Sequence, residues 1–266
     1  TCYFSFAEQC EITLEANPNS LTEDYLRSLK RTSVNRLSIG IQSFSDNDLH
    51  ILGRKHTAKQ AEECMYLAQK YGFTNLSVDL IYGFPGLNLE KWKHTLEKIK
   101  DIPHLSCYQL SLEHKTPLYR HIQDGSYQAL SEEEIMQQYE YLTGFAKKHD
   151  FIHYETSNFC KKGCESRHNS SYWKAEPYIG LGPGAHSFDG QSRQWNVPDI
   201  NTYISFYKNV DSEQHSLSQG ENILFEKEIL TPDMLYNEYL MTSLRTIWGC
   251  DYRYIQRQFG EKYLEY

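Results

Sequence analysis

Between Cys10 and about Phe159 the chain alternates strand-like segments with segments that have helix start signals. The strand-like segments have alternating or continuous apolar residues and span 11–18, 36–44, 75–85, 104–113 and 151–159. Helices are expected after the capping boxes at 20–23 and 131–134, from Thr57 with Gln60 to a stop at Gly72, and near Asn88. Strands that alternate with helices predict a parallel sheet, either doubly wound or part of a barrel.

Beyond Asp189 this alternation ends. Segments 201–210 and 230–249 have helical patterns, with Pro232 near a helix start and Gly249 at its stop. We therefore predict an α/β part over residues 1–197, either doubly wound or part of a barrel, and a small helical C-terminal domain over residues 198–266. Five parallel strands are too few to close a barrel, and segment 11–18 would have an unpaired edge. The chain is thus expected to be a fragment whose first strands precede Thr1.

Composition excludes several classes of function. The formal charge is −8 and no long run of Lys and Arg occurs, which argues against a nucleic-acid partner. No stretch of 18 apolar residues is present, and the N-terminal residues do not resemble a signal peptide, so a cytoplasmic protein is expected. Seven cysteines without a repeated spacing make a disulfide framework improbable.

Polar side chains gather toward the ends of the expected strands. They are Glu15, Gln42, Asp79, Gln109 with Ser111, and Glu155 with Ser157. Parallel α/β proteins place their sites at the C-terminal ends of strands, so these side chains predict a shared pocket. Each of them could alternatively cap local backbone.

The stretch from Arg167 to Asp189 combines aromatic residues and histidines with a glycine-proline loop. His168 could be a loop histidine bonded to backbone, or an axial haem ligand with Tyr172 and Trp173 along the porphyrin face. The glycines at 180, 182 and 184 permit close backbone approach to a ligand, but no helix pattern follows, which argues against a dinucleotide site. His186 could point into a cofactor cleft or be a structural histidine.

Seven blocks of the sequence occur in the order known from one family. They are LEANP at 14–18, NRLSIGIQSF at 35–44, LGRKH at 52–56, VDLIYGFPG at 78–86, YETSNF at 154–159, HNSSYW at 168–173 and YIGLGPGAHS at 178–187. Together they resemble the radical S-adenosylmethionine (SAM) proteins related to oxygen-independent coproporphyrinogen III oxidase. HNSSYW looks like the haem chaperone branch rather than the true oxidase. The resemblance implies a partial (β/α) radical SAM-type barrel with a helical C-terminal domain.

The resemblance also implies cofactors. The family holds SAM on a [4Fe–4S] cluster, and the positions that match its SAM contacts are Glu15, Gln42, Arg54 and Asp79, with Ser111 and His186 as weaker matches. The C-x3-C-x2-C cluster motif and the Gly-rich turn of the family are absent, and both would lie upstream of Thr1. Cys160 and Cys164 come closest to this cluster motif, but three thiolates are the usual minimum for a cluster that also binds SAM. This chain is expected to bind no cluster and to perform no radical chemistry.

Three functions remain open at this stage. The leading hypothesis is a haem chaperone that holds haem at His168, with Tyr172 and Trp173, and passes it to an acceptor protein. Peripheral contact with membrane proteins is left open. The second is oxidative decarboxylation of coproporphyrinogen III in haem biosynthesis. The third is an ordinary α/β enzyme or binding module that uses the strand-end carboxylates. The catalytic residues, the acceptor and the oligomeric state are not specified by the sequence.

Overall fold

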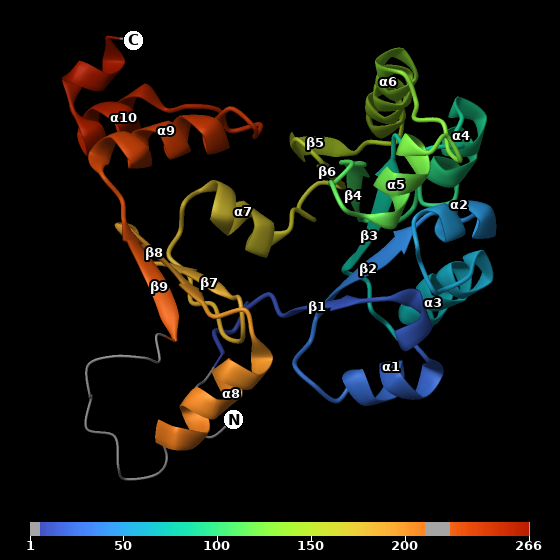
Figure 1. Ribbon diagram of the computed structural model, residues 1–266, viewed down its shortest axis with the longest axis horizontal. Coiled ribbons are helices and arrows are strands. Elements are labelled where there is room, and N and C mark those ends of the chain that lie inside the picture. The colour runs from blue at the N-terminus through green and yellow to red at the C-terminus, as the bar shows by residue number, and fades with distance from the viewer. Residues whose placement is uncertain (1–5, 211–223, 266) are drawn as a thin grey trace. The chain divides into compact units, whose positions relative to one another are not determined.

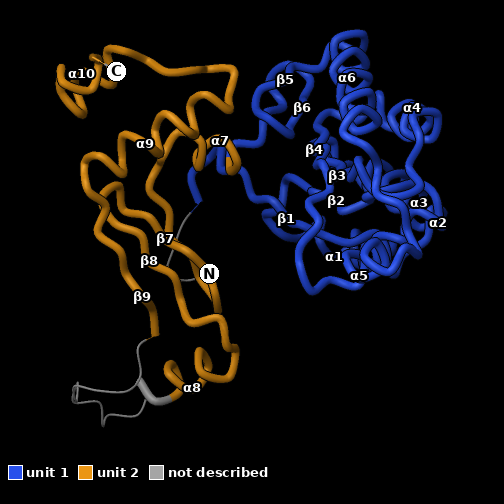
Figure 2. Tube along the Cα trace, turned by 45° about the horizontal axis from the view of Figure 1, so that its top comes forward, with its two compact units in different colours: residues 1–167 blue, residues 168–266 orange. Residues whose placement is uncertain are grey.

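The computed structural model describes residues 6–210 and 224–265. The chain forms two compact units, Thr1–Arg167 and His168–Tyr266 (Figure 2). This division falls before residue 197, where the sequence analysis ended the barrel.

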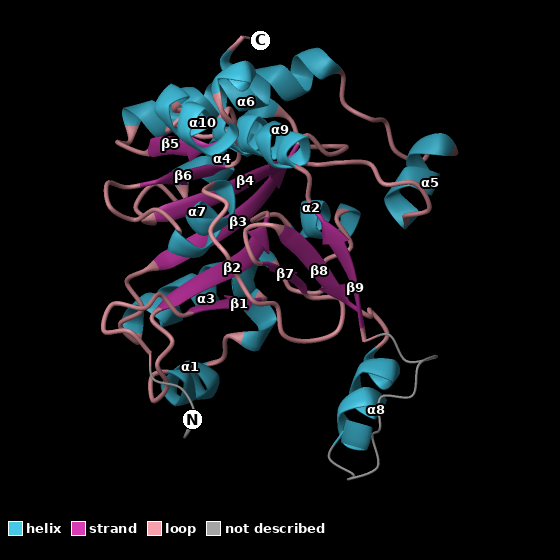
Figure 3. Ribbon diagram, turned by 90° about the vertical axis from the view of Figure 1, so that its left-hand side faces the viewer, coloured by secondary structure: helices cyan, strands magenta, loops and turns pink. Residues whose placement is uncertain are grey.

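Unit 1 contains a six-stranded sheet in the order β1-β2-β3-β4-β6-β5 (Figure 3). Its strands are β1 (Thr13–Ala16), β2 (Arg36–Gln42), β3 (Leu76–Tyr82), β4 (His104–Gln109), β5 (Ile152–Glu155) and β6 (Asn158–Cys160). Strands β1 to β4 are parallel, as predicted. The segment expected as one fifth strand is instead a tight hairpin, because the chain turns back at Thr156 and Ser157 and β6 pairs antiparallel with both β4 and β5.

Helices follow the strands of unit 1 (Figure 1). They are η1 (Pro18–Ser20), α1 (Glu23–Leu29), α2 (Asp46–Ile51), α3 (Ala58–Lys70), α4 (Leu89–Glu97), α5 (Pro117–Gln123) and α6 (Glu132–Lys148). The capping boxes at Thr57 and Ser131 are confirmed. The box expected at Ser20 is wrong, because Thr22 is the N-cap of α1 and accepts the amide hydrogen of Tyr25. A short 3-10 turn, η1, precedes α1 and has Pro18 at its first position.

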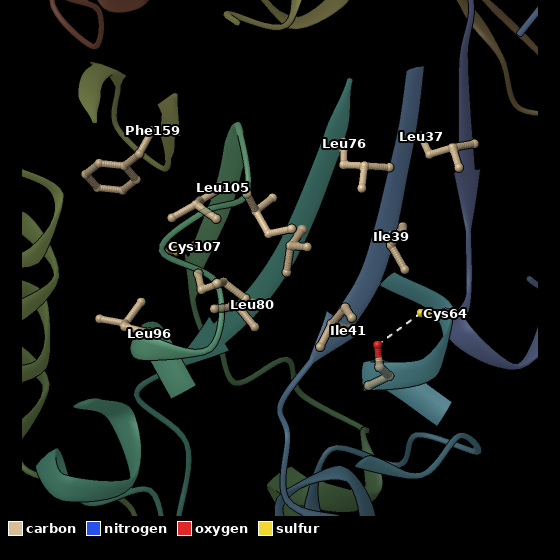
Figure 4. Packing of buried hydrophobic residues seen from close by; sticks show 14 of the residues in the cluster. Leu37, Ile39, Ile41, Cys64, Leu76, Leu80, Leu96, Leu105, Cys107 and Phe159 are labelled. Atoms are coloured by element: carbon tan, nitrogen blue, oxygen red, sulfur yellow. Dashed lines mark hydrogen bonds between the residues drawn. The ribbon is translucent and has the colours of Figure 1, made fainter. Parts of the chain in front are cut away.

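The core of unit 1 lies on one face of the sheet. Alternate residues of β2, β3 and β4 point to this face, where α1, α3, α4 and α6 supply the facing side chains. Figure 4 shows Leu37, Ile39 and Ile41 of β2 on the same side as Leu76 and Leu80. Because strand side chains alternate, the residues between them lie on the opposite face. Those residues are mostly polar, and they make up the candidate site.

Unit 2 combines helices with a small antiparallel sheet in the order β7-β8-β9. Its elements are α7 (Arg167–Trp173), β7 (His186–Phe188), β8 (Ser192–Asn196), α8 (Ile200–Val210), β9 (Phe225–Ile229), α9 (Pro232–Ser243), α10 (Tyr252–Phe259) and η2 (Glu261–Leu264). The helical patterns beyond residue 198 are confirmed by α8 and by α9, which has Pro232 in its first turn and ends at Ser243 rather than near Gly249. The sheet contradicts a purely helical second part. None of the helices in the described ranges is long and apolar enough to cross a bilayer.

Candidate functional site

A row of polar residues crosses the polar face of the unit 1 sheet. Glu15 on β1 pairs with Ser38 on β2, and the Ser38 hydroxyl donates to Oδ1 of Asp79 on β3 at 3.2 Å. Asp79 in turn pairs with Ser106 on β4, which pairs with Asn158 on β6. Hydrogen-bonded and register neighbours therefore join five strands through one line of polar side chains. Asp79 lies in the middle of β3 rather than at its end, so the row crosses the sheet itself.

Asp79 is the most perturbed carboxylate in this row. Burial raises the pKa of Asp79 to about 6, and the negative charge of Glu15 acts in the same direction. Hydrogen bonds from Ser106 and Ser38 and the positive charge of Arg36 act against this rise in pKa. A buried carboxylate with a raised pKa is typical of a functional site rather than of a structural position.

Gln42 ends β2 in an unusual backbone conformation. Its φ is 65°, in the left-handed region, and the register of β2 against β3 shifts between Ile39 and Gln42. The side chain is only 8% exposed, and its Nε2 atom lies 3.0 Å from where a Cβ on Gly40 would be. Non-glycine residues in this conformation are strained, and bulges of this kind occur next to active sites. Gln42 is therefore held where its side chain points back over the polar face.

Replacing Gln42 with glycine separates the effect of its backbone conformation from the effect of its side chain. Glycine adopts positive φ without strain, so Gln42→Gly should leave the stability of the chain unchanged or raise it by up to about 1 kcal/mol. Gln42→Ala keeps the strained Cβ and should be the less stable variant of the two. Urea denaturation of both variants measures this difference. A Gln42→Gly protein less stable than Gln42→Ala would show that the positive φ carries no strain, and one less stable than the parent chain would show that contacts of the Gln42 side chain outweigh the strain.

The loop that carries Arg54 is fixed to the end of β2 by a histidine. His56 is 5% exposed, and its Nε2 lies 2.9 Å from the carbonyl oxygen of Ile41. Burial lowers the pKa of His56, the positive charge of Arg54 lowers it further, and the bond to Ile41 acts in the opposite direction. Arg54 itself is exposed, and Ser111 is exposed two residues beyond the end of β4. His56 belongs to the LGRKH block at 52–56 but was not among the residues predicted for the site.

A second buried polar group lies at the N-terminal ends of the strands. His104 is fully buried, with Nδ1 2.7 Å from the hydroxyl of Ser77 and Nε2 2.8 Å from that of Tyr154. The Tyr154 oxygen also accepts the amide hydrogen of Ser166. Burial lowers the pKa of His104 to about 3, and the charge of Arg36 contributes. The imidazole is therefore neutral at pH 7 and connects three strands to the end of unit 1.

Glu155 and Ser157 show the alternative role of a strand-end polar residue, which is to cap the local backbone. Glu155 is 4% exposed, and its Oε1 accepts the Ser157 amide hydrogen at 3.1 Å across the hairpin turn. This carboxylate therefore caps its own turn. Gln109 ends β4 and is exposed.

The HNSSYW block forms helix α7 rather than a loop. His168 and Tyr172 are one helical turn apart, with ring centroids 4.8 Å apart in an edge-on contact. Tyr172 also contacts Tyr178 edge-on at 4.7 Å. Trp173 lies elsewhere, under the guanidinium of Arg245 at 5.4 Å. Of the three expected haem contacts, the helix thus brings His168 and Tyr172 together and separates Trp173 from them.

The glycine loop before β7 packs against its own strand. A Cβ on Gly180 would overlap the carbonyl oxygen of His186, and the Gly180 amide donates to the Ser187 hydroxyl at 3.0 Å. At Gly180, the close backbone approach that the sequence predicts is therefore made by the chain itself, at His186. His186 is exposed on β7, and its ring stacks on Trp195 at 6.1 Å.

The two cysteines closest to a metal motif differ in environment. Cys160 is fully buried on β6, and burial raises its pKa to about 12, whereas Cys164 is partly exposed with a raised pKa of the same cause. Protonated thiols are poor ligands. Across the described ranges, no three His, Cys, Asp or Glu side chains are grouped to hold a metal ion. The residues that the structure describes do not fit a [4Fe–4S] cluster.

The polar row does fit one part of SAM. The adenosine end of SAM offers hydroxyl and amine donors, which suit the carboxylates of Glu15 and Asp79. Of the six expected SAM positions, unit 1 brings Glu15 and Asp79 into one row, with Gln42 at the end of the neighbouring strand.

Comparison with known proteins adds a family to this geometry. Residues 4–99 match the model of the radical SAM superfamily. The chain is 39% identical over 255 residues to "Heme chaperone HemW" of Bacillus subtilis, covering 95% of this chain and 64% of that protein. It is 36% identical over 196 residues to the protein of the same name from Lactococcus lactis, of which it covers 52%. The chain thus spans about half to two thirds of the length of these two relatives.

A solved structure agrees with the fold. Coproporphyrinogen III oxidase (HemN) from Escherichia coli superimposes with a TM-score of 0.78 at 22% identity, over 99% of this chain and 61% of that one. At this identity the likeness shows the fold alone, a partial radical SAM-type (β/α) barrel in unit 1. Residues 4–99 therefore match part of a radical SAM domain, and over most of its length the chain is similar to proteins named haem chaperone HemW.

Proposed function

We propose that the full-length protein is a haem chaperone, which binds haem through His168 and transfers it to an acceptor protein in the cytoplasm. The observation that carries the proposal is the helix that places His168 beside Tyr172, with ring centroids 4.8 Å apart. Neutral imidazole is the common axial ligand of haem iron, and a tyrosine ring beside it offers apolar surface to the porphyrin. The relatives named as haem chaperones support this choice over decarboxylation of coproporphyrinogen III.

The barrel supplies the second part of the proposal. In the full-length protein we expect SAM to lie on the polar face of the sheet, contacting Glu15, Asp79 and Gln42, with Arg54 reaching its carboxylate. When bound, the family's cluster and SAM supply radical chemistry. The residues of this chain hold and orient SAM and keep Asp79 within reach of its hydroxyl groups. Ser111 remains a weaker candidate for such a contact, and peripheral contact with membrane proteins remains part of the proposal.

Haem titration of the His168→Ala protein tests the function. Loss of the axial ligand should weaken haem binding at least about tenfold, equivalent to 1.4 kcal/mol, and should shift the Soret band. His121→Ala is the matched control, because His121 is an exposed histidine on α5. A His168→Ala protein with the affinity and spectrum of the parent chain would exclude His168 as the ligand.

A further inference from the structure

Unit 2 contains a cavity of about 490 Å³ that no expected site residue except Tyr172 lines. Its walls come from α7, the segment around β7 and β8, and helices α9 and α10. This volume lies within the range of roughly 300–1,000 Å³ that is typical of small-molecule sites. All of these elements belong to one compact unit.

Aromatic rings form both walls of this cavity. On one side Tyr172, Tyr178 and Phe188 form a chain of contacts, with ring centroids 4.7 and 6.2 Å apart. Two hydrogen bonds of 2.9 Å between the backbones of Tyr178 and Phe188 fix that wall. Aromatic faces on a fixed scaffold favour a flat, apolar ligand.

The other wall belongs to α9 and α10. Tyr239 and Tyr254 stack at 4.6 Å with an interplanar angle of 29°, and Phe259 lies 6.2 Å from both rings. The Tyr239 hydroxyl accepts the amide hydrogen of Asp251 at 2.7 Å, so this hydroxyl already has a hydrogen-bond partner within unit 2. The two helices therefore also present ring surface to the cavity, together with the polar side chains of Glu238, Thr242 and Gln258.

The charges in the cavity cancel each other. Among the described residues that line it, only Arg193 and Glu238 are charged, and they form an ion pair at 2.7 Å. A ligand's carboxylates would have to compete with Glu238 for Arg193, which is unfavourable in a partly buried site. The cavity therefore suits an uncharged edge of a ligand, and any carboxylates should point outward.

We propose that this cavity takes the apolar, vinyl-bearing edge of a porphyrin whose iron is bound by His168. Tyr172 connects the cavity to His168, because it lines the cavity and contacts His168 one helical turn away. The iron lies at the centre of a ring that extends several ångströms in every direction, so a porphyrin over His168 must rest on neighbouring surface. The inference rests on the proposed haem function and adds the position and orientation of the ring.

Filling the cavity tests the proposal. Leu235 lines the cavity from α9, so Leu235→Trp should weaken haem binding at least tenfold while the Soret position stays that of the parent chain, because His168 is intact. Met241→Trp is the control, since Met241 is on the same helix, 56% exposed and outside the cavity lining. Tyr254→Ala, which removes a wall, should weaken binding as well. Circular dichroism establishes that each variant is folded.

Iron-free protoporphyrin IX separates the two proposals. It needs no axial ligand, so its binding should be unaffected by His168→Ala and lost in Leu235→Trp. Haem and protoporphyrin affinities that are unchanged in both Leu235→Trp and Tyr254→Ala would overturn the cavity proposal and leave the haem function standing. A parent chain that binds neither compound would overturn both.

Discussion

The His104→Ala protein is expected to lose about 4 kcal/mol of unfolding free energy in unit 1. His104 is fully buried, and both ring nitrogens have partners, Ser77 at 2.7 Å and Tyr154 at 2.8 Å. Removing the ring leaves a cavity and two buried hydroxyl groups that have lost a partner. Both effects belong to the few mechanisms that produce large destabilisation.

Hydrogen exchange of peptides that cover β3 and β4 measures this loss locally, because these strands carry Ser77 and His104. Ser77→Ala removes one hydrogen bond without a large cavity and should cost about 1–2 kcal/mol. The exposed His94 on α4 provides the matched control, and His94→Ala should stay within about 0.5 kcal/mol of the parent chain. A loss below about 1 kcal/mol in His104→Ala would show that water or neighbouring side chains replace the imidazole.

The parts of the fold that the sequence predicts are those whose burial leaves a pattern. Strand β3 lies within the nearly continuous apolar run at 75–85 and is buried on its core face, so its position could be predicted. Helix α5 has no buried residue, and strand β9 is exposed along its whole length, so neither has an apolar pattern. The hairpin of β5 and β6 was missed because two small polar residues turn the chain within one strand-like stretch.

The site could be predicted only in part, for a different reason. Glu15 and Asp79 were found from their residue types and their family blocks. Ser38 and Ser106, which join them, are ordinary residues whose importance depends on the register of β1 to β4. Register arises from pairing between distant segments and cannot be read from one strand. The strained conformation of Gln42 likewise depends on the bulge between β2 and β3.

The ionised carboxylate of Asp79 lowers the stability of the folded chain at neutral pH, which indicates a functional role for this residue. Its folded pKa is about 6, above the ordinary value of 3.8, so protonation stabilises the folded chain. That stabilisation is fully present below pH 3.8 and is lost as the pH rises through 6. At pH 7 the ionised carboxylate therefore costs about 2–3 kcal/mol, since one pKa unit corresponds to about 1.4 kcal/mol. Retention of such a cost is expected where a carboxylate serves binding.

Asp79→Asn should remove this cost, because asparagine has no ionised form and its amide oxygen can still accept from Ser38. We expect a gain of about 2–3 kcal/mol at pH 7 that shrinks as the pH falls below 6 and vanishes near pH 4. His104 has the opposite linkage: its folded pKa of about 3 lies below the ordinary 6.5, so the chain loses stability as the pH falls from 6.5 toward 3. The two effects oppose each other between pH 4 and 6 in the parent chain, whereas the variant retains only that of His104. Urea denaturation at pH 4, 5, 6 and 7 should therefore give a steeper acid dependence for Asp79→Asn, and parallel curves would exclude a raised pKa for Asp79.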